Sequence, residues 1–119
     1  MDRRKELKMA YKETPPPMGV YQIRNKVNGK ILVGSSMNLP GKFNSSSFQL
    51  NFNSYPIKEL QGDWKIFGSD SFAFEILETL EYEKMPKENW RTAVSEMEEK
   101  WLNSLQPYCQ KGYNKLKKE

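Results

Sequence analysis

The chain has 119 residues, of which 37% are hydrophobic and 29% charged, and its formal net charge is +4. This length is typical of one domain with a modest core, and no apolar run approaches the roughly 20 residues that would span a bilayer. The sequence has no histidine and one cysteine, Cys109, which excludes Cys/His zinc sites, Ser-His-Asp triads and a histidine general base. A lone cysteine and the absence of a signal-peptide pattern predict a cytoplasmic location.

Much of the basic excess lies at the two ends of the chain. The residues are Arg3, Arg4, Lys5 and Lys8 at one end and Lys115, Lys117 and Lys118 at the other. Basic ends favour polyanions, nucleic acid first among them, although a solvated surface is an equally good interpretation. Residues 2–12 predict an amphipathic helix, and the proline run at 15–17 predicts an extended linker after it. We therefore divide the chain into a basic helix and linker (1–17), a folded domain (18–114) and a basic tail (115–119).

The folded domain opens with a predicted β-hairpin. Residues 18–23 form the first strand and residues 31–33 the return strand, with Asn28 and Gly29 between them. An Asn-Gly pair between two such stretches is typical of a two-residue type I′ turn.

Two helices are predicted next. Asn38 can cap a helix that has Pro40 in its first turn, but the residues that follow, FNSSSFQLNFNS, are poor helix formers and predict a short or irregular helix. Residues 56–67 have an apolar helical face, and Gly68 can end that helix.

A strand and a long helix complete the domain. In residues 71–78, Phe72, Phe74 and Ile76 alternate with their neighbours, which predicts a third strand. Residues 87–105 predict a helix whose apolar stripe is Trp90, Val94, Met97, Trp101 and Leu105. The order hairpin, helix, helix, strand, helix predicts an α+β fold: a small three-stranded antiparallel sheet flanked by helices, with an N-terminal helical extension.

Several of these features occur together in one known family. Gly19-Val20-Tyr21 and Leu32-Val33-Gly34, placed across the Asn-Gly hairpin, resemble the paired motif of the GIY-YIG nucleases. The resemblance continues through Ser35-Ser36, Leu60-Gln61 with Trp64 and Gly68, the FAFEIL strand, Glu98 before Trp101, and Gly112-Tyr113-Asn114. It covers residues 19–114 in the family's order and with similar spacing.

The resemblance implies a phosphodiester-cleaving site on the sheet. Tyr21 matches the first motif tyrosine, which can hold or deprotonate the attacking water. Glu98 matches the carboxylate that holds a single Mg²⁺ or Mn²⁺ ion, and a single carboxylate with several waters suits Mg²⁺. Gly34, Ser35, Ser36 and Asn114 are expected beside the nucleic acid, which by resemblance is DNA; a turn role for Asn114 is equally open.

The chain also departs from the family pattern. Leu32 stands where the second motif has its tyrosine, so one hydroxyl of the site is missing. Lys42 stands where homing-type relatives have an arginine; it keeps the charge and the expected contact with nucleic acid but loses the planar, bidentate fork that fits phosphate. Tyr55 falls where those relatives often have a histidine, and we expect it to be a partly exposed loop aromatic.

Three functions are consistent with these residues. The first is a nuclease-family domain that binds nucleic acid and cleaves weakly or not at all. The second is an active Mg²⁺-dependent endonuclease that uses Tyr21, Lys42 and Glu98. The third is a protein-interaction module without a nucleic-acid partner. We favour the first, because loss of one transition-state donor costs ~10²–10³ in rate and two positions differ here. Oligomeric state is not predictable from this sequence.

Overall fold

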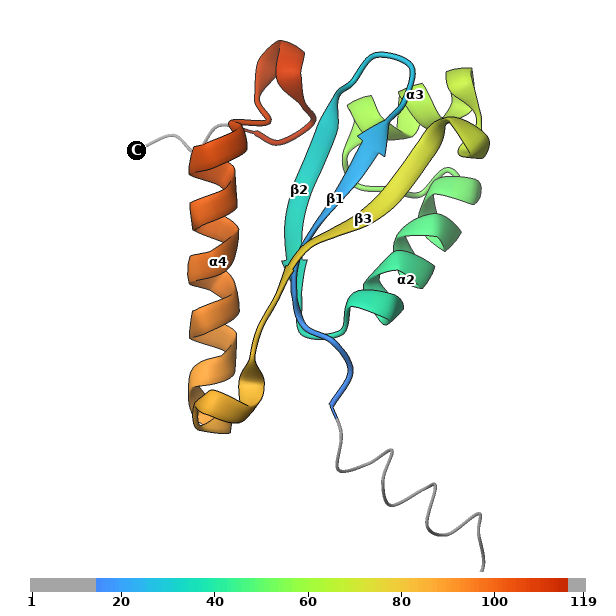
Figure 1. The fold of residues 1–119 in the computed structure, drawn as a ribbon. Helices are drawn as coiled ribbons and strands as arrows, with labels where there is room; N and C mark the ends of the chain where they lie inside the picture. Colours follow the sequence, from blue (N-terminus) through green and yellow to red (C-terminus); the bar gives the residue numbers. More distant parts are fainter. Residues whose placement is uncertain (1–14, 116–119) are drawn as a thin grey trace, which may run out of the picture.

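The computed structural model describes residues 15–115 (Figure 1). The helix predicted over residues 2–12 and most of the basic tail lie outside the described residues. In chain order the elements are β1 (Gly19–Asn25), β2 (Ile31–Ser36), α2 (Leu39–Asn51), α3 (Lys58–Phe67), β3 (Phe72–Thr79) and α4 (Trp90–Leu105). Short 3₁₀ turns occur at Ser69–Ser71, Tyr82–Lys84, Lys87–Asn89 and Cys109–Lys111. Within residues 15–115, no helix combines the length and apolar character needed to cross a membrane.

The three strands form one antiparallel sheet in the order β2-β1-β3. This arrangement confirms the predicted α+β fold and the pairing of the 19–35 hairpin with the strand around residues 72–77. The predicted alternation in β3 fails at Ile76, which is 48% exposed. Ile76 lies next to a register shift, where Tyr21 pairs with Ile76 but Val20 pairs with Glu78, so Leu77 has no partner across β1.

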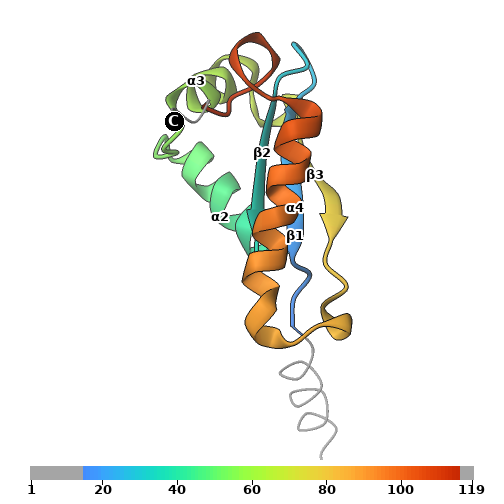
Figure 2. The ribbon, with the colours of Figure 1, turned by 90° about the vertical axis from the view of Figure 1, so that its left-hand side faces the viewer.

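The helices cover the sheet from both sides. Figures 1 and 2 show α4 along one face and α2 and α3 against the other. The larger core lies between the sheet and α2 and α3. It contains Tyr21, Ile23, Leu32, Leu39, Leu50, Tyr55, Leu60, Trp64, Phe72 and Tyr113. On the α4 side, Val94 is the one buried residue of the helix.

The loop between β1 and β2 differs from the predicted two-residue type I′ turn. The Asn25 N–H donates to the Lys30 carbonyl at 2.9 Å, so four residues lie between the last bonded pair. Gly29 has a φ of +78°, whereas Asn28 has no positive φ, and a type I′ turn requires both. The cause is the buried Asn25 side chain, which accepts a hydrogen bond from the Val27 N–H at 2.9 Å and so fixes a wider turn.

Helix α2 contradicts the prediction of a short or irregular helix, since it is regular over 13 residues. The Asn38 side chain accepts a hydrogen bond from the Gly41 N–H at 3.0 Å, as the sequence predicted for its cap. Leu39 and Leu50 are 0% and 1% exposed, at the two ends of the helix. Burial of this face outweighs the low helix propensity of the Asn and Ser residues between them.

Helices α3 and α4 lie close to their predicted positions. Helix α3 ends at Gly68, whose φ of +87° suits glycine, as predicted. Helix α4 begins at Trp90 rather than at residue 87, because residues 87–89 form a 3₁₀ turn ahead of it. Its predicted apolar stripe faces the sheet only in part, since Val94 alone is buried and the other four members are half-buried.

Candidate active site on the edge strand

Tyr21 lies across the glycine of the second motif. In the register of β1 and β2, Tyr21 is paired with Gly34, and a Cβ on Gly34 would lie 2.6 Å from the Tyr21 hydroxyl. Only a residue without a side chain leaves room for the phenol there. The Phe43 ring of α2 packs edge-on against the Tyr21 ring at 5.7 Å, which fixes the phenol against the edge strand β2.

The Tyr21 hydroxyl is not fully buried, although the ring that carries it is buried. It makes no hydrogen bond within residues 15–115, yet it is not among the fully buried polar atoms that lack a partner. The Tyr21 side chain as a whole is only 4% exposed. A buried ring with an accessible hydroxyl can present a hydrogen bond in one fixed direction.

Glu98 meets β2 one residue further along. The Ser35 hydroxyl donates to the Glu98 carboxylate at 2.6 Å, and the Glu98 side chain is half-buried between α4 and the strand. Glu98 therefore lies at the border of the face that α4 packs against the sheet. Tyr21 of β1 thus lies across Gly34 and Glu98 of α4 contacts Ser35, so the two side chains border adjacent residues of β2.

The surroundings of Tyr21 keep its phenol neutral. Burial raises its pKa well above the ordinary value, and the nearby Tyr55 phenol and the negative charge of Glu98 raise it further. At neutral pH the hydroxyl is therefore a hydrogen-bond donor and not a phenolate base.

Tyr55 is buried, which corrects the expectation of a partly exposed loop aromatic. Its side chain is 8% exposed and belongs to the core cluster that contains Tyr21. The Gln61 side chain fixes this segment: it accepts from the Tyr55 N–H at 3.0 Å and donates to the Leu50 carbonyl at 2.9 Å. Burial raises the pKa of Tyr55, and the nearby Ser46 hydroxyl opposes that rise. Gln61 is the residue whose role the sequence did not signal.

The Tyr55 hydroxyl is therefore a second hydroxyl near Tyr21, but it comes from the loop after α2 and not from the second motif. Leu32, in the place of the motif tyrosine, is 4% exposed and packs in the core. Ser46 is fully buried. Among the described residues, its Oγ is the one buried side-chain oxygen or nitrogen without a hydrogen-bond partner. Sequence spacing could not indicate this, because Tyr55 comes near Tyr21, and Ser46 near Tyr55, only when α2 and the loop after it pack on the sheet.

Lys42 has no ion-pair partner among the described residues. It lies in α2, one residue before Phe43, and its side chain is half-exposed. Within residues 15–115 its ammonium forms no ion pair with any carboxylate. The structure thus places Lys42 on the helix that packs on Tyr21 and gives it no fixed partner.

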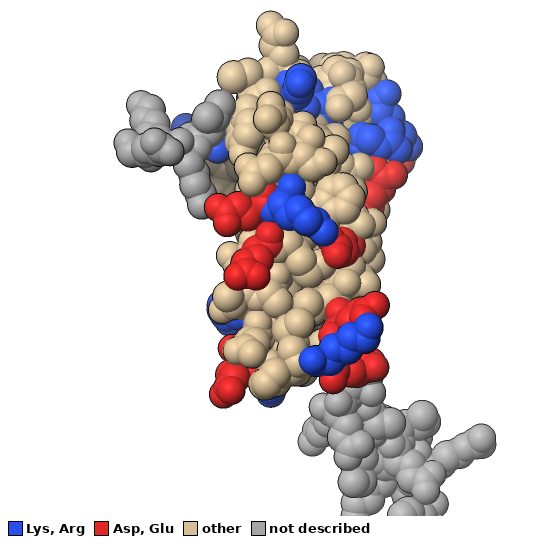
Figure 3. Space-filling view, turned by 60° about the vertical axis from the view of Figure 1, so that its left-hand side comes forward, with Lys and Arg blue, Asp and Glu red and all other residues tan. Residues whose placement is uncertain are grey.

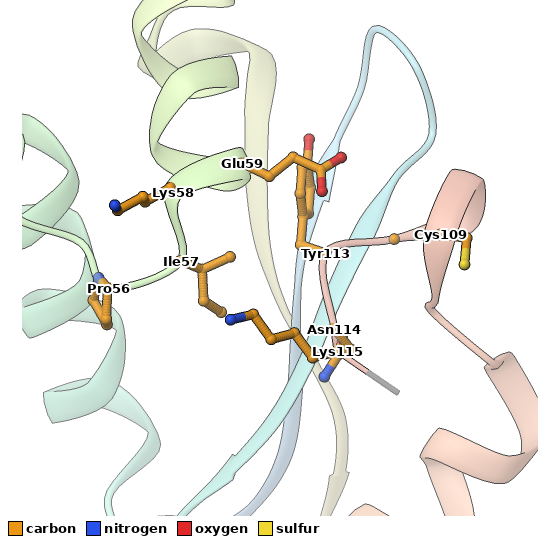
Figure 4. A pocket seen from close by; sticks show the side chains of 9 residues that line it. Pro56, Ile57, Lys58, Glu59, Cys109, Tyr113, Asn114 and Lys115 are labelled. Atoms are coloured by element: carbon orange, nitrogen blue, oxygen red, sulfur yellow. The ribbon is translucent and has the colours of Figure 1, made fainter. Parts of the chain in front are cut away.

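Asn114 ties the C-terminal segment to β2. Its side chain donates to the Val33 carbonyl and accepts from the Val33 N–H, both at 2.8 Å. Figure 4 shows Asn114 beside a pocket of about 340 Å³ between this segment and the start of α3, with Lys115 extending towards Ile57. Both polar atoms of Asn114 are occupied, so its role in the structure is to support the edge strand.

Glu98 is the one carboxylate that the site offers to a metal ion. Within the described residues, no three His, Cys, Asp or Glu side chains gather in a metal-binding group. A single carboxylate fits an ion that keeps most of its waters, as Mg²⁺ does, so the donor set is compatible with the expected ion.

Ser36 lies at the end of β2, where its hydroxyl donates to the Asn38 carbonyl at 3.0 Å.

Charge on the α4 side of the molecule is mixed. Figure 3 looks onto that side and shows Lys and Arg close to Asp and Glu. One such group is the Lys100–Glu78 ion pair, at 2.6 Å. A polyanion would find no broad patch of one sign on this face.

Two solved structures are similar to the chain. One is the catalytic domain of the intron endonuclease I-TevI, in a mutant form, with 28% identity and a TM-score of 0.67 over 82% of this chain and 92% of that chain. The other is the catalytic domain of the homing endonuclease I-TevI, with 27% identity and a TM-score of 0.68 over 84% of this chain and 99% of that chain. No protein-family model and no curated protein matches the chain.

Proposed function

Because the chain has the GIY-YIG endonuclease fold, we propose that it is a nucleic-acid-binding domain in which phosphodiester cleavage is weakened or absent. The observation that carries this proposal is that Tyr21 and Glu98 border adjacent residues of the edge strand, Gly34 and Ser35, while the second motif supplies a buried leucine. DNA is the substrate that the endonuclease relatives suggest. Fold alone does not establish activity, so the proposal depends on this site.

The groups that remain can perform part of the chemistry. Tyr21, held neutral, can donate a hydrogen bond to a phosphate oxygen or orient a water molecule. Glu98 would hold a divalent ion, Mg²⁺ or Mn²⁺, which when bound stabilises negative charge on the phosphate. The hydroxyl of Ser35 holds the Glu98 carboxylate in place.

The missing groups account for the weakened activity. Leu32 can neither donate to a phosphate nor hold a water molecule. Lys42 is a point charge on a flexible stem without a fixed partner, and loose placement alone can cost ~10²-fold in rate. Both losses affect stabilisation of the transition state, for which positioned donors matter most.

Plasmid cleavage with Mg²⁺ and with Mn²⁺ tests this proposal. We expect the wild type to cleave slowly or undetectably and the variant Leu32→Tyr with Lys42→Arg to cleave faster. Leu32→Phe with Lys42→Arg is the matched control, since it adds the ring without the hydroxyl. Because Leu32 is buried, thermal unfolding of each variant must be measured beside its activity.

An active Mg²⁺-dependent endonuclease that uses Tyr21, Lys42 and Glu98 is the second candidate. The proximity of Tyr21 and Glu98 favours it, since neither the metal ligand nor the first tyrosine is lost. Robust cleavage by the wild type that Glu98→Ala abolishes would establish this alternative. Failure of the wild type to bind DNA or RNA at low salt would instead favour a protein-interaction module.

A further inference from the structure

A groove beside Glu98 combines Ser35 and Ser36, which the family resemblance singled out, with Arg91 and Ser95 of α4, which it did not. A groove of about 300 Å³ separates the end of β2 from the first turns of α4. It is lined by Ser35, Ser36, Met37, Arg91, Val94 and Ser95. Ser35 connects the groove to the candidate active site, because the same residue donates its hydroxyl to Glu98.

Helix geometry places Arg91, the cation that lines the groove, on the same face of α4 as Glu98. Arg91, Ser95 and Glu98 are spaced by four and three residues, so they follow one another along a single face of α4. Glu98 contacts β2 at Ser35, and this face of the helix therefore runs along the end of the strand. Arg91 lies about two turns from the carboxylate, so a strand bound at Arg91 can extend past the position where Glu98 would hold a metal ion.

The groove contains donors that the fold leaves free. Within residues 15–115, the Arg91 guanidinium forms no ion pair and the Ser95 hydroxyl forms no hydrogen bond. The hydroxyls of Ser35 and Ser36 are already committed, to Glu98 and to the Asn38 carbonyl. The available side-chain groups are thus one planar cation and one hydroxyl.

The backbone of β2 adds a third donor. Val33 directs its N–H and carbonyl outward, to the Asn114 side chain, so these groups do not pair with β1. Residues two apart in a strand direct their backbone groups the same way in an antiparallel ladder. The Ser35 N–H therefore also faces outward from the edge strand. Asn114 covers the strand at Val33, so it leaves the Ser35 N–H available as a donor.

We propose that the groove between β2 and α4 binds a phosphate group of a nucleic-acid strand, with Arg91 as its cation and Ser95 and the Ser35 N–H as further donors. This inference rests on the proposed nucleic-acid-binding function and specifies where the strand lies. A guanidinium matches two phosphate oxygens at once, which an ammonium cannot do. Arg91 thereby supplies, from α4, the bidentate cation that Lys42 does not provide from α2.

Binding of a labelled 20-base-pair DNA duplex, measured by fluorescence anisotropy in EDTA over a range of salt concentrations, tests the proposal without catalysis. We expect Arg91→Gln to weaken binding about tenfold at low salt and to lower the slope of log K against log salt by about one. Arg91→Lys should keep the slope and lose part of the affinity. The matched control is Lys65→Gln, which removes the same charge from the last turn of α3 and should change affinity less than about twofold.

The possible results separate this inference from the proposed function. If the wild type binds and Arg91→Gln binds with the same affinity and slope, the groove is not a phosphate site, although the proposed function stands. If the wild type does not bind the duplex at all, the proposed function fails and the inference with it. Displacement of the duplex by millimolar inorganic phosphate at matched ionic strength would identify a free-phosphate site and overturn the assignment to a strand. Circular dichroism of each variant checks that the fold is intact.

Discussion

The position of Tyr21 depends on a single neighbouring residue, Gly34. A sequence motif of tyrosine and glycine on adjacent strands suggests a functional pair, but the structure gives a steric reason for the glycine. The phenol occupies the volume that a side chain on Gly34 would fill. The direction of the Tyr21 hydroxyl therefore depends on the absence of a side chain at Gly34 of the edge strand.

Gly34→Ala should displace Tyr21 and destabilise the fold. The added methyl group would meet the Tyr21 hydroxyl and ring at the edge strand, and overpacking costs about 1–3 kcal/mol. Urea unfolding measures the change. Gly62→Ala is the control, because a Cβ on Gly62 in α3 meets nothing within 4 Å and should stabilise that helix by about 0.5–1 kcal/mol. Equal stability of the Gly34→Ala variant and the wild type would show that Tyr21 can move aside without cost.

Among the elements, α2 is the one whose existence depends most on tertiary contacts. Its low intrinsic propensity is offset by the Asn38 cap at one end and by buried Leu39 and Leu50 along its inner face. The helix also carries Phe43, which packs on Tyr21, and Ser46, which lies near Tyr55. Fraying of α2 would therefore loosen the candidate site as well as the core.

Asn38→Ala should lower the free energy of unfolding by about 1 kcal/mol, because the Gly41 N–H would lose its acceptor at the start of α2. Hydrogen exchange of the α2 amides should speed up more than that of the β1 amides. Asn44→Ala, at an exposed position within the same helix, is the control and should be neutral or slightly stabilising. Uniformly faster exchange over the whole sheet would indicate that α2 does not open as a separate unit.

At the scale of the whole molecule, the C-terminal segment joins parts of the fold that are far apart in sequence. The Tyr113 hydroxyl donates to Asp63 of α3 at 2.7 Å and accepts from the Asn25 side chain at the end of β1 at 3.1 Å. Asn114 holds the edge strand at Val33. These contacts link the C-terminal end of the folded part to β1, β2 and α3.

The free energy of unfolding should fall as pH rises from about 10 towards 12. Burial, followed by the hydrogen bond to Asp63, raises the pKa of Tyr113 to about 12, above the value of ~10 in the unfolded chain. The folded state thus keeps the proton longer, and the stability this provides is present below pH 10 and is lost as pH approaches 12. In Tyr113→Phe the decline over this range should be smaller, although the variant starts from a lower stability. Urea unfolding at several pH values measures both slopes, and identical slopes would exclude Tyr113 as a source of the decline.

The sequence by itself determined the order of the elements, the pairing of the three strands and the resemblance to the nuclease family. These depend on local patterns: alternation in the strands, the cap at Asn38, the stop at Gly68 and the spacing of the motif residues. Interactions of this kind act within a few residues, so they can be recognised before the fold is known.

Only the tertiary structure decided the rest. The length of α2 and the burial of Tyr55 result from contacts between segments distant in the chain, and burial of apolar surface there outweighs local propensity. The wider hairpin loop depends on the Asn25 side chain, which bonds locally to the Val27 N–H and also donates to the distant Tyr113 hydroxyl. The same is true of the candidate site, where Glu98 reaches Ser35, next to the glycine opposite Tyr21, because α4 packs along the edge strand, and of Arg91, which no motif singles out. Arg91 belongs to no motif, and it gains a functional interpretation only because the fold places it beside Ser35, which does belong to one.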